Sequence, residues 1–220
     1  MNMLTKATTV AAAVMAMSAA SAAPVVVHHG QVAQPVKGSS ASLAVLYDQS
    51  ANDSGIGIVS QNFETTFDAY DAQAADDFVV PAGSTWKVAE VDVAGQYFNG
   101  LGLAASEHIT FFRDKGGKPG KAIADFPGLV GTDNGTGSFS IRLPKVVKLP
   151  AGTYWISVQA DLAFLAGGEW AWENQSTVEG AAAVWVNPNG GFATGCAKWT
   201  TETTCIPDGQ GDHMFVLKGR

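Results

Sequence analysis

One stretch, Leu149–Gln159, limits the possible fold more than any other part of the chain. Pro150–Gly152 indicates a turn, and the residues that follow are rich in β-branched and aromatic side chains. Every second residue of Tyr154–Val158 would face one side of an extended strand, and that side is typical of a hydrophobic core. Trp155 would face the other side, so that side is either covered by another layer or used for contact. We therefore expect a central strand of a β-sandwich here.

Short segments of the same kind recur along the chain and are separated by Gly, Pro, Asn and Asp turns. They number about ten, and helical periodicity is not sustained anywhere, which favours an all-β, two-sheet antiparallel sandwich that is jelly-roll-like. A bulge is expected near Ala89–Glu90, a turn over Pro81–Ser84 and a helical turn over Ala69–Ala75. The other expected strands are Leu43–Asp48, Ile56–Phe63, Phe78–Pro81, Trp86–Phe98, His108–Arg113, Ser138–Leu143, Glu169–Glu173, Ala182–Val186 and His213–Leu217.

The first residues have the pattern of an export signal. Lys6 precedes the short apolar run Val10–Ala20, and Ala20-Ser21-Ala22 has the small-x-small form of a signal-peptidase site. We predict a signal peptide over 1–22, a linker or flexible N-terminal arm over 23–42 and a β-sandwich domain over 43–220. The expected product is secreted, extracellular or periplasmic, and does not insert into a membrane after signal cleavage.

Charge and cysteine content narrow the possible partners. The chain has 13 Lys and Arg against 20 Asp and Glu, a formal net charge of −7, and its cations are scattered along the sequence. This balance argues against nucleic acid or an anionic membrane as a partner. Cys196 and Cys205 are close together, and in an oxidising compartment we expect them to form a local disulfide.

Five segments taken in order resemble a known group. They are an ADDF segment within Ala75–Pro81, Trp86 with Val91–Tyr97, an F-x-D-x-x-G-x-P-G turn within Phe111–Gly120, GTYW at Gly152–Trp155, and a closing F-x-L-x-G within Met214–Gly219. The set resembles a poorly characterised group of exported bacterial β-sandwich modules. The resemblance implies a jelly-roll-like module on the cell exterior and no established activity.

Aromatic residues give the first functional hypothesis. Trp170 and Trp172 share one face of a predicted strand, and Trp199 lies in the loop that the disulfide would constrain. Aromatic rings on a sandwich face can stack on sugar rings, while Glu173 and Asn174 would bind hydroxyls. The alternative is that the rings fill the core, because tryptophan is costly to expose. The first hypothesis is thus an exported, non-catalytic module that binds a polysaccharide or a cell-surface protein.

Four aspartates, Asp68, Asp71, Asp76 and Asp77, lie close enough in sequence to share one structural calcium ion. Calcium takes six to eight oxygen ligands, but no EF-hand spacing is present. The alternative interpretation is a solvated acidic loop in which aspartates cap local turns.

Two further hypotheses differ in class. The chain could be a structural envelope or matrix component that acts through protein contacts. It could also be a polysaccharide-active hydrolase or lyase with Glu169 and Glu173 as paired acids. The chain has neither a G-x-S-x-G elbow nor an H-E-x-x-H motif, so the sequence favours a non-catalytic module.

Overall fold

A computed structural model describes residues 27–28 and 43–220. The predicted signal peptide, 1–22, lies outside the described residues, as does most of the predicted linker. The strands are β1 (Val27–His28), β2 (Ala44–Gln49), β3 (Asp53–Val59), β4 (Gln61–Asn62), β5 (Gln73–Val93), β6 (Gly95–Phe98), β7 (Ser106–Asp114), β8 (Pro119–Leu129), β9 (Thr132–Asp133), β10 (Phe139–Asp161), β11 (Glu169–Gln175), β12 (Val184–Val186), β13 (Thr200–Thr201), β14 (Asp212–His213) and β15 (Phe215–Gly219). The helices are the 3-10 helix η1 (Thr65–Tyr70), α1 (Phe164–Gly167) and α2 (Glu202–Cys205).

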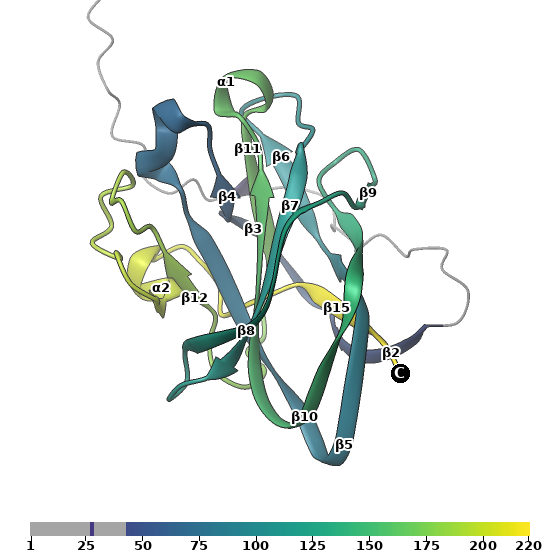
Figure 1. Ribbon diagram of the computed structural model, residues 1–220. Helices are drawn as coiled ribbons and strands as arrows, with labels where there is room; N and C mark the ends of the chain where they lie inside the picture. The colour runs from purple at the N-terminus through teal and green to yellow at the C-terminus, as the bar shows by residue number, and fades with distance from the viewer. Residues whose placement is uncertain (1–26, 29–42) are drawn as a thin grey trace, which may run out of the picture.

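The strands form two layers, which confirms the predicted all-β sandwich (Figure 1). The smaller sheet has five strands in the order β1-β3-β11-β14, with β6 also paired to β11. The larger sheet has ten strands and follows the path β13-β12-β5-β10-β7-β8, joined by β2, β4, β9 and β15. The described strands pair in antiparallel fashion throughout, apart from the parallel pairing of β4 with β10.

The two longest strands, β5 and β10, pair with each other and extend together at the lower end of the molecule (Figure 1). The chain bends sharply at Pro81–Ser84, as predicted, and the bend brings the rings of Phe78 and Trp86 to 6.1 Å between centroids, although pairing with β10 continues on both sides (Figure 1). Val80 pairs with Gly152 and Thr85 pairs with Pro150, so residues 81–84 oppose Ala151 alone and form a large bulge at this bend. A bulge bends the pair without ending it, because the partner strand continues on both sides.

The bulge predicted near Ala89–Glu90 is present. Lys218 of β15 pairs with Glu90 and Gly219 pairs with Val88, so Ala89 is the extra residue of β5. The same place opposes a bulge of β10, in which Arg142 pairs with Glu90 and Val147 pairs with Val88. Residues 143–146 are therefore free of the ladder, and this loop forms one edge of the groove described below.

The core lies between the sheets, and β10 is buried on both faces over residues 154–160. Tyr154, Ile156 and Val158 belong to the main core cluster, whereas Trp155 packs in a smaller cluster with Ala75 and Val184 on the opposite face of the strand. The prediction of a central strand is confirmed, and its second face is covered by loop residues, among them Ala181 and Trp199. The largest fully buried side chains are Trp155, Trp170, Trp172, Trp185, Phe78, Phe111, Phe139 and Phe215.

Two local predictions differ from the structure. The helical turn expected over Ala69–Ala75 lies earlier, at η1, because Ala72, Ala74 and Ala75 are buried and the last two belong to β5. Val27 and His28, expected in a flexible arm, pair with Gly57 and Ile56 of β3. Within the described residues, no helix is long and apolar enough to cross a membrane.

Candidate functional site

The two tryptophans predicted to bind sugar are in the core. Trp170 and Trp172 are both 0% exposed. Trp170 donates its indole N–H to the carbonyl of Gly137 at 2.7 Å, and Trp172 donates to the carbonyl of Met214 at 3.0 Å. Because neither ring reaches the surface, the predicted stacking face on β11 is wrong, and the alternative interpretation holds for these two rings.

Their polar neighbours are also inside. Glu173 and Asn174 are fully buried. Asn174 Nδ2 donates to the carbonyl of Asp212 at 3.1 Å, and its Oδ1 accepts the N–H of Gln210 at 3.1 Å. The amide therefore links neighbouring segments of the chain and is not available to bind ligand hydroxyls. Glu169, the other predicted acid of a hydrolase, is buried too, which removes an accessible acid pair from β11.

Trp199 keeps part of its surface. The disulfide between Cys196 and Cys205, with 5.9 Å between their Cα atoms, confirms the predicted pairing and closes the loop that carries Trp199. Its ring packs edge-on against Phe112, with 6.1 Å between ring centroids, and its carbonyl accepts a hydrogen bond from Lys118 Nζ at 3.2 Å. Trp199 therefore covers the outer face of the larger sheet.

A buried polar cluster joins several of the predicted residues. Asp76 accepts hydrogen bonds from Gln49 Nε2 at 2.6 Å, from the His213 N–H at 2.7 Å and from the Asp77 N–H at 2.8 Å. The His213 Nε2 lies 2.8 Å from a carboxylate oxygen of Glu202. Gln49, Asp76, His213 and Glu202 are at most 1% exposed, so this cluster fastens β2, β5, β14 and α2 together and is closed to any ligand.

Burial explains the titration of these acids. Desolvation is the largest effect on three of them: it raises the pKa of Asp77 to about 6, that of Asp212 to about 7 and that of Asp76 well above its ordinary range. The neighbouring carboxylate of Asp212 raises the pKa of Asp76 further. At pH 7, a pKa of about 6 leaves Asp77 mostly ionised, and a pKa of about 7 leaves Asp212 about half protonated.

The four aspartates proposed for calcium are not gathered around one point. Asp71 accepts the N–H of Phe63 at 2.8 Å and lies near Asp68, whereas Asp76 and Asp77 lie in or beside the buried cluster. In residues 27–28 and 43–220, no three His, Cys, Asp or Glu side chains are arranged as metal ligands. Calcium binding by these aspartates stays a prediction.

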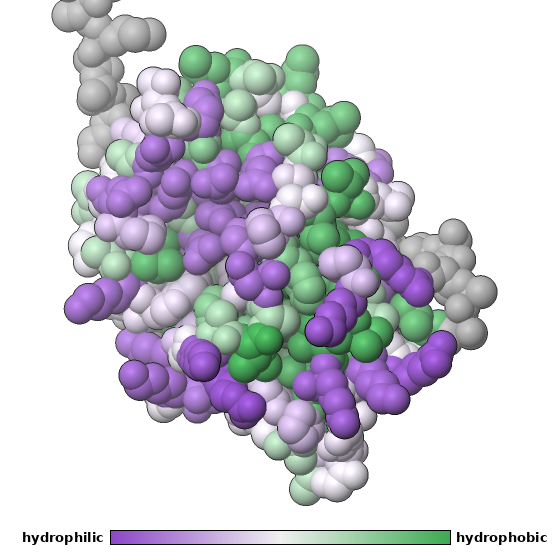
Figure 2. Space-filling view, viewed as in Figure 1, coloured by the Kyte–Doolittle hydropathy of each residue, from purple (hydrophilic) through white to green (hydrophobic). Residues whose placement is uncertain are grey.

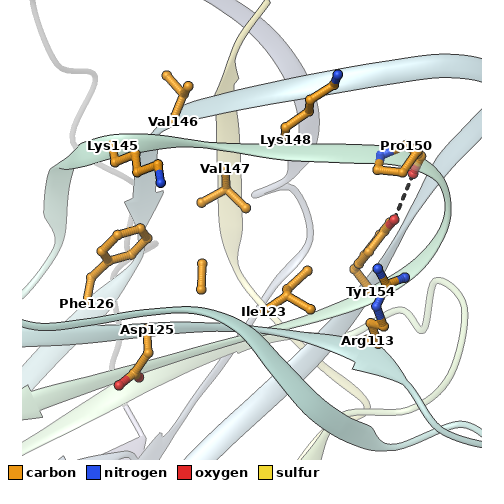
Figure 3. Close-up of a pocket in the computed structure, with 11 residues that line it drawn as sticks. Arg113, Ile123, Asp125, Phe126, Lys145, Val146, Val147, Lys148, Pro150 and Tyr154 are labelled. Carbon is orange, nitrogen blue, oxygen red and sulfur yellow. Dashed lines mark hydrogen bonds between the residues drawn. The ribbon is translucent and has the colours of Figure 1, made fainter.

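An open groove of about 470 Å³ lies between β8 and β10 (Figure 3). Its floor is apolar and contains Ile123 and Val147, with Phe126 at one end, and Ala124 also lines the groove. Tyr154 closes the other end, where its hydroxyl donates to the carbonyl of Pro150 at 2.9 Å. We call this the β8–β10 groove, and its remaining lining residues are Arg113, Asp125, Lys145, Val146, Lys148 and Pro150.

The local sequence explains how the groove forms. The bulge of β10 at residues 143–146 releases Lys145 and Val146 from the ladder, so that both are exposed at the rim, while Val147 turns back into the core. Lys148 points outward again because side chains alternate along the strand. Figure 2 shows hydrophobic surface between β8 and β10 with hydrophilic residues around it.

The rim of the groove is positively charged. Arg113, Lys145 and Lys148 are exposed, and Asp125 is the one carboxylate of the lining. Asp125 accepts hydrogen bonds from His108 Nε2 and Thr110 Oγ1, both at 2.7 Å, and the bond from His108 is the main cause of its lowered pKa. A single, already bonded carboxylate suits binding better than glycoside hydrolysis, which uses a pair of acids.

Sequence reasoning missed this site. The cations are scattered along the sequence, but the fold places Arg113 of β7 and Lys145 and Lys148 of β10 in the lining of one groove. The available signal was local: Lys145 and Lys148 flank two valines directly after Pro144, at the end of a predicted strand.

Comparisons with known proteins give little further information. No family model matches the chain, and no curated protein matches it. A solved structure that it resembles is described as the crystal structure of the cysteine protease and lectin-like domains of Cwp84, a surface layer associated protein of Clostridium difficile. The identity is 14% and the TM-score 0.45. The similarity covers 68% of this chain and 32% of that one, so this chain spans less than half of the matched structure.

Proposed function

We propose that this chain is an exported, non-catalytic β-sandwich module that binds carbohydrate in the β8–β10 groove. The observation that carries the proposal is the combination of an open apolar floor with two exposed, donor-bearing side chains beside it, Arg113 and Lys145. The formed disulfide supports export, since disulfides persist in oxidising compartments.

The chemistry of the groove fits a sugar chain. A pyranose ring has apolar C–H faces, and Ile123, Val147 and Phe126 offer apolar surface against which such a face can pack. Its hydroxyls need hydrogen-bond partners, which Arg113 and Lys145 can supply as donors. The groove is built on strands of one sheet, so little of its backbone has to be ordered on binding.

Affinity electrophoresis in gels that contain individual polysaccharides tests the proposal. We expect the wild-type chain to be retained by at least one of them, and Phe126→Ala to weaken retention about tenfold. Phe164→Ala is the matched control, because Phe164 is also half-buried against the core but lies at α1, away from the groove. Absence of retention on every polysaccharide, or equal loss in both variants, contradicts the proposal.

A second candidate function, a structural envelope component acting through protein contacts, is favoured by one surface feature. Leu101, Leu103 and Leu165 are 93%, 63% and 78% exposed. They lie at one end of the sandwich, where the Gly102 N–H donates to the Gly167 carbonyl at 3.0 Å and joins the loop before β7 to α1. Exposed apolar groups of this kind mark association sites. Sedimentation that stays monomeric at high concentration, and no co-purifying protein, would count against this function.

A further inference from the structure

A second groove adjoins the first. It has a volume of about 310 Å³ and is lined by Leu43, Lys87, Ala89, Arg142, Val146 and Arg220. Val146 lines both grooves, so they lie on either side of the bulge of β10. The strand register places Lys87, which lines the second groove, directly opposite Lys148, which lines the first. The cations of the two grooves are therefore neighbours at this point.

The distribution of charge around the two grooves is strongly biased. All 20 acidic residues of the chain fall within the described part, against 11 of the 13 basic ones, since Lys6 and Lys37 fall outside it. The linings nevertheless contain six cations and one acid, which reverses the overall ratio. Binding of a neutral ligand would not require this concentration of positive charge in the groove linings.

Most of these cations are not paired with a neighbouring carboxylate. Glu90 and Asp92 are buried next to the second groove, but both are held by Lys218, at 2.9 Å in the case of Glu90. Arg142 lies 3.7 Å from Glu90 and so shares that carboxylate. Within residues 43–220, the other five cations of the two linings form no ion pair with a carboxylate, and they are exposed.

We infer that the ligand is an acidic polysaccharide whose chain crosses both grooves, with its carboxylates against the cations and its ring faces on the apolar floor. This inference rests on the proposed function and specifies the substrate class of the same site. Charge complementarity identifies the ligand, because uronic-acid carboxylates match Lys and Arg donors and an otherwise acidic protein repels polyanions elsewhere on its surface.

The grooves fit a nucleic acid less well. Proteins that bind single-stranded nucleic acid present aromatic rings on which bases stack. Here Tyr154 is only 3% exposed and bonded through its hydroxyl to Pro150, and Phe126 is half-buried at the end of the floor. Sugar rings need only the apolar floor that is present.

Isothermal titration with alginate, polygalacturonate and hyaluronan, and with each polymer after carboxyl reduction, tests the inference. We expect at least one acidic polymer to bind about tenfold or more tightly than its reduced, neutral form, and its affinity to fall between about 20 and about 300 mM NaCl. Lys145→Gln with Lys148→Gln should lower this affinity about tenfold, and Lys87→Gln with Arg220→Gln should lower it separately. Lys198→Gln, the matched loss of one charge in the disulfide loop, should not change it.

The possible failures are distinguishable. Equal binding of acidic and reduced polymers overturns the inference and leaves the proposed function standing, whereas no binding of any carbohydrate removes the proposed function. Tighter binding of a single-stranded DNA oligonucleotide than of any acidic polymer also overturns it. If only the first pair of substitutions has an effect, the ligand does not cross the second groove. Thermal melting of each variant shows that a lost affinity is not a lost fold.

Discussion

The imidazole of His213 stacks on the indole of Trp172, with 4.4 Å between ring centroids and 17° between ring planes. Both residues are fully buried and lie on β14 and β11, which are neighbouring strands of the smaller sheet. The contact places a polar ring in the protein interior, where an aromatic face covers one side and Glu202 lies at its edge. It shows why the tryptophans of β11 are part of the core.

We predict that Trp172→Ala lowers the free energy of unfolding by about 3–5 kcal/mol, the usual cost of truncating a large buried ring. Trp172→Phe should cost less, because it keeps an aromatic face for His213 and loses mainly the hydrogen bond to Met214. Urea unfolding followed by tryptophan fluorescence measures both. Leu101→Ala, at a residue 93% exposed, is the control and should change stability by less than about 0.5 kcal/mol.

Local patterns predicted the fold well. Period-two alternation located the central strand over Thr153–Gln159, the change of parity near Ala89–Glu90 located a bulge, and the spacing of two cysteines located the disulfide. These features depend on neighbours in sequence. Whether Trp172 faces the core or solvent depends on which sheet covers β11, and a strand buried on both sides carries no periodic signal for that choice.

The groove could not be predicted for the same reason. The groove forms because β8 and the bulged part of β10 lie close together in the larger sheet. This places Arg113, Ile123 and Lys145 in one lining. These residues are far apart in sequence, so no local pattern indicates that their cations line one groove. The bend at Pro81–Ser84 is different, because Pro and Gly mark an irregular backbone locally, and the strand bends sharply there.

Stability should fall as pH rises from about 4 to about 7. Desolvation raises the pKa of Glu107 to about 7, that of Asp212 to about 7 and that of Asp77 to about 6, so the folded protein keeps protons that the unfolded chain releases near pH 4. The folded state therefore binds more protons in this window, and raising the pH favours unfolding. Melting temperatures across the window measure the slope, and Asp212→Asn should flatten it. A melting temperature that rises steadily to pH 7 would contradict the assignment.

Lys218 holds two buried carboxylates, those of Glu90 and Asp92. We predict that Lys218→Met costs about 3–5 kcal/mol of stability, because it leaves Asp92 buried without a cation and Glu90 with only the more distant Arg142, at 3.7 Å. Combining it with Glu90→Gln and Asp92→Asn should recover most of the loss, since the uncompensated charges are then gone. Chemical unfolding of the single and triple variants measures this. Lys198→Met is the exposed control, and equal losses in the single and triple variants would show that packing dominates.

The disulfide should support stability without contributing to the groove. Replacing Cys196 and Cys205 together by serine should cost about 2.5–3 kcal/mol, the chain-entropy value for a loop this short. The loop covers the face of β10 that carries Trp155, whereas the groove lies on the face that carries Tyr154. We therefore expect a lower melting temperature and unchanged polysaccharide affinity. A loss of affinity in a folded variant would place the loop in the binding site.

A substitution of Trp199 distinguishes most directly between two possible ligand sites, the β8–β10 groove and the disulfide loop. It is the one predicted sugar-binding tryptophan that keeps surface, but it packs with Phe112 on the opposite side of the larger sheet from Tyr154 and the groove. Trp199→Ala should therefore leave polysaccharide affinity within about twofold of wild type, while the lost packing costs about 1–2 kcal/mol. Titration and thermal melting of the same sample measure the two effects. If affinity disappears and the fold persists, the ligand binds at the disulfide loop, because no contact made in the β8–β10 groove depends on this ring.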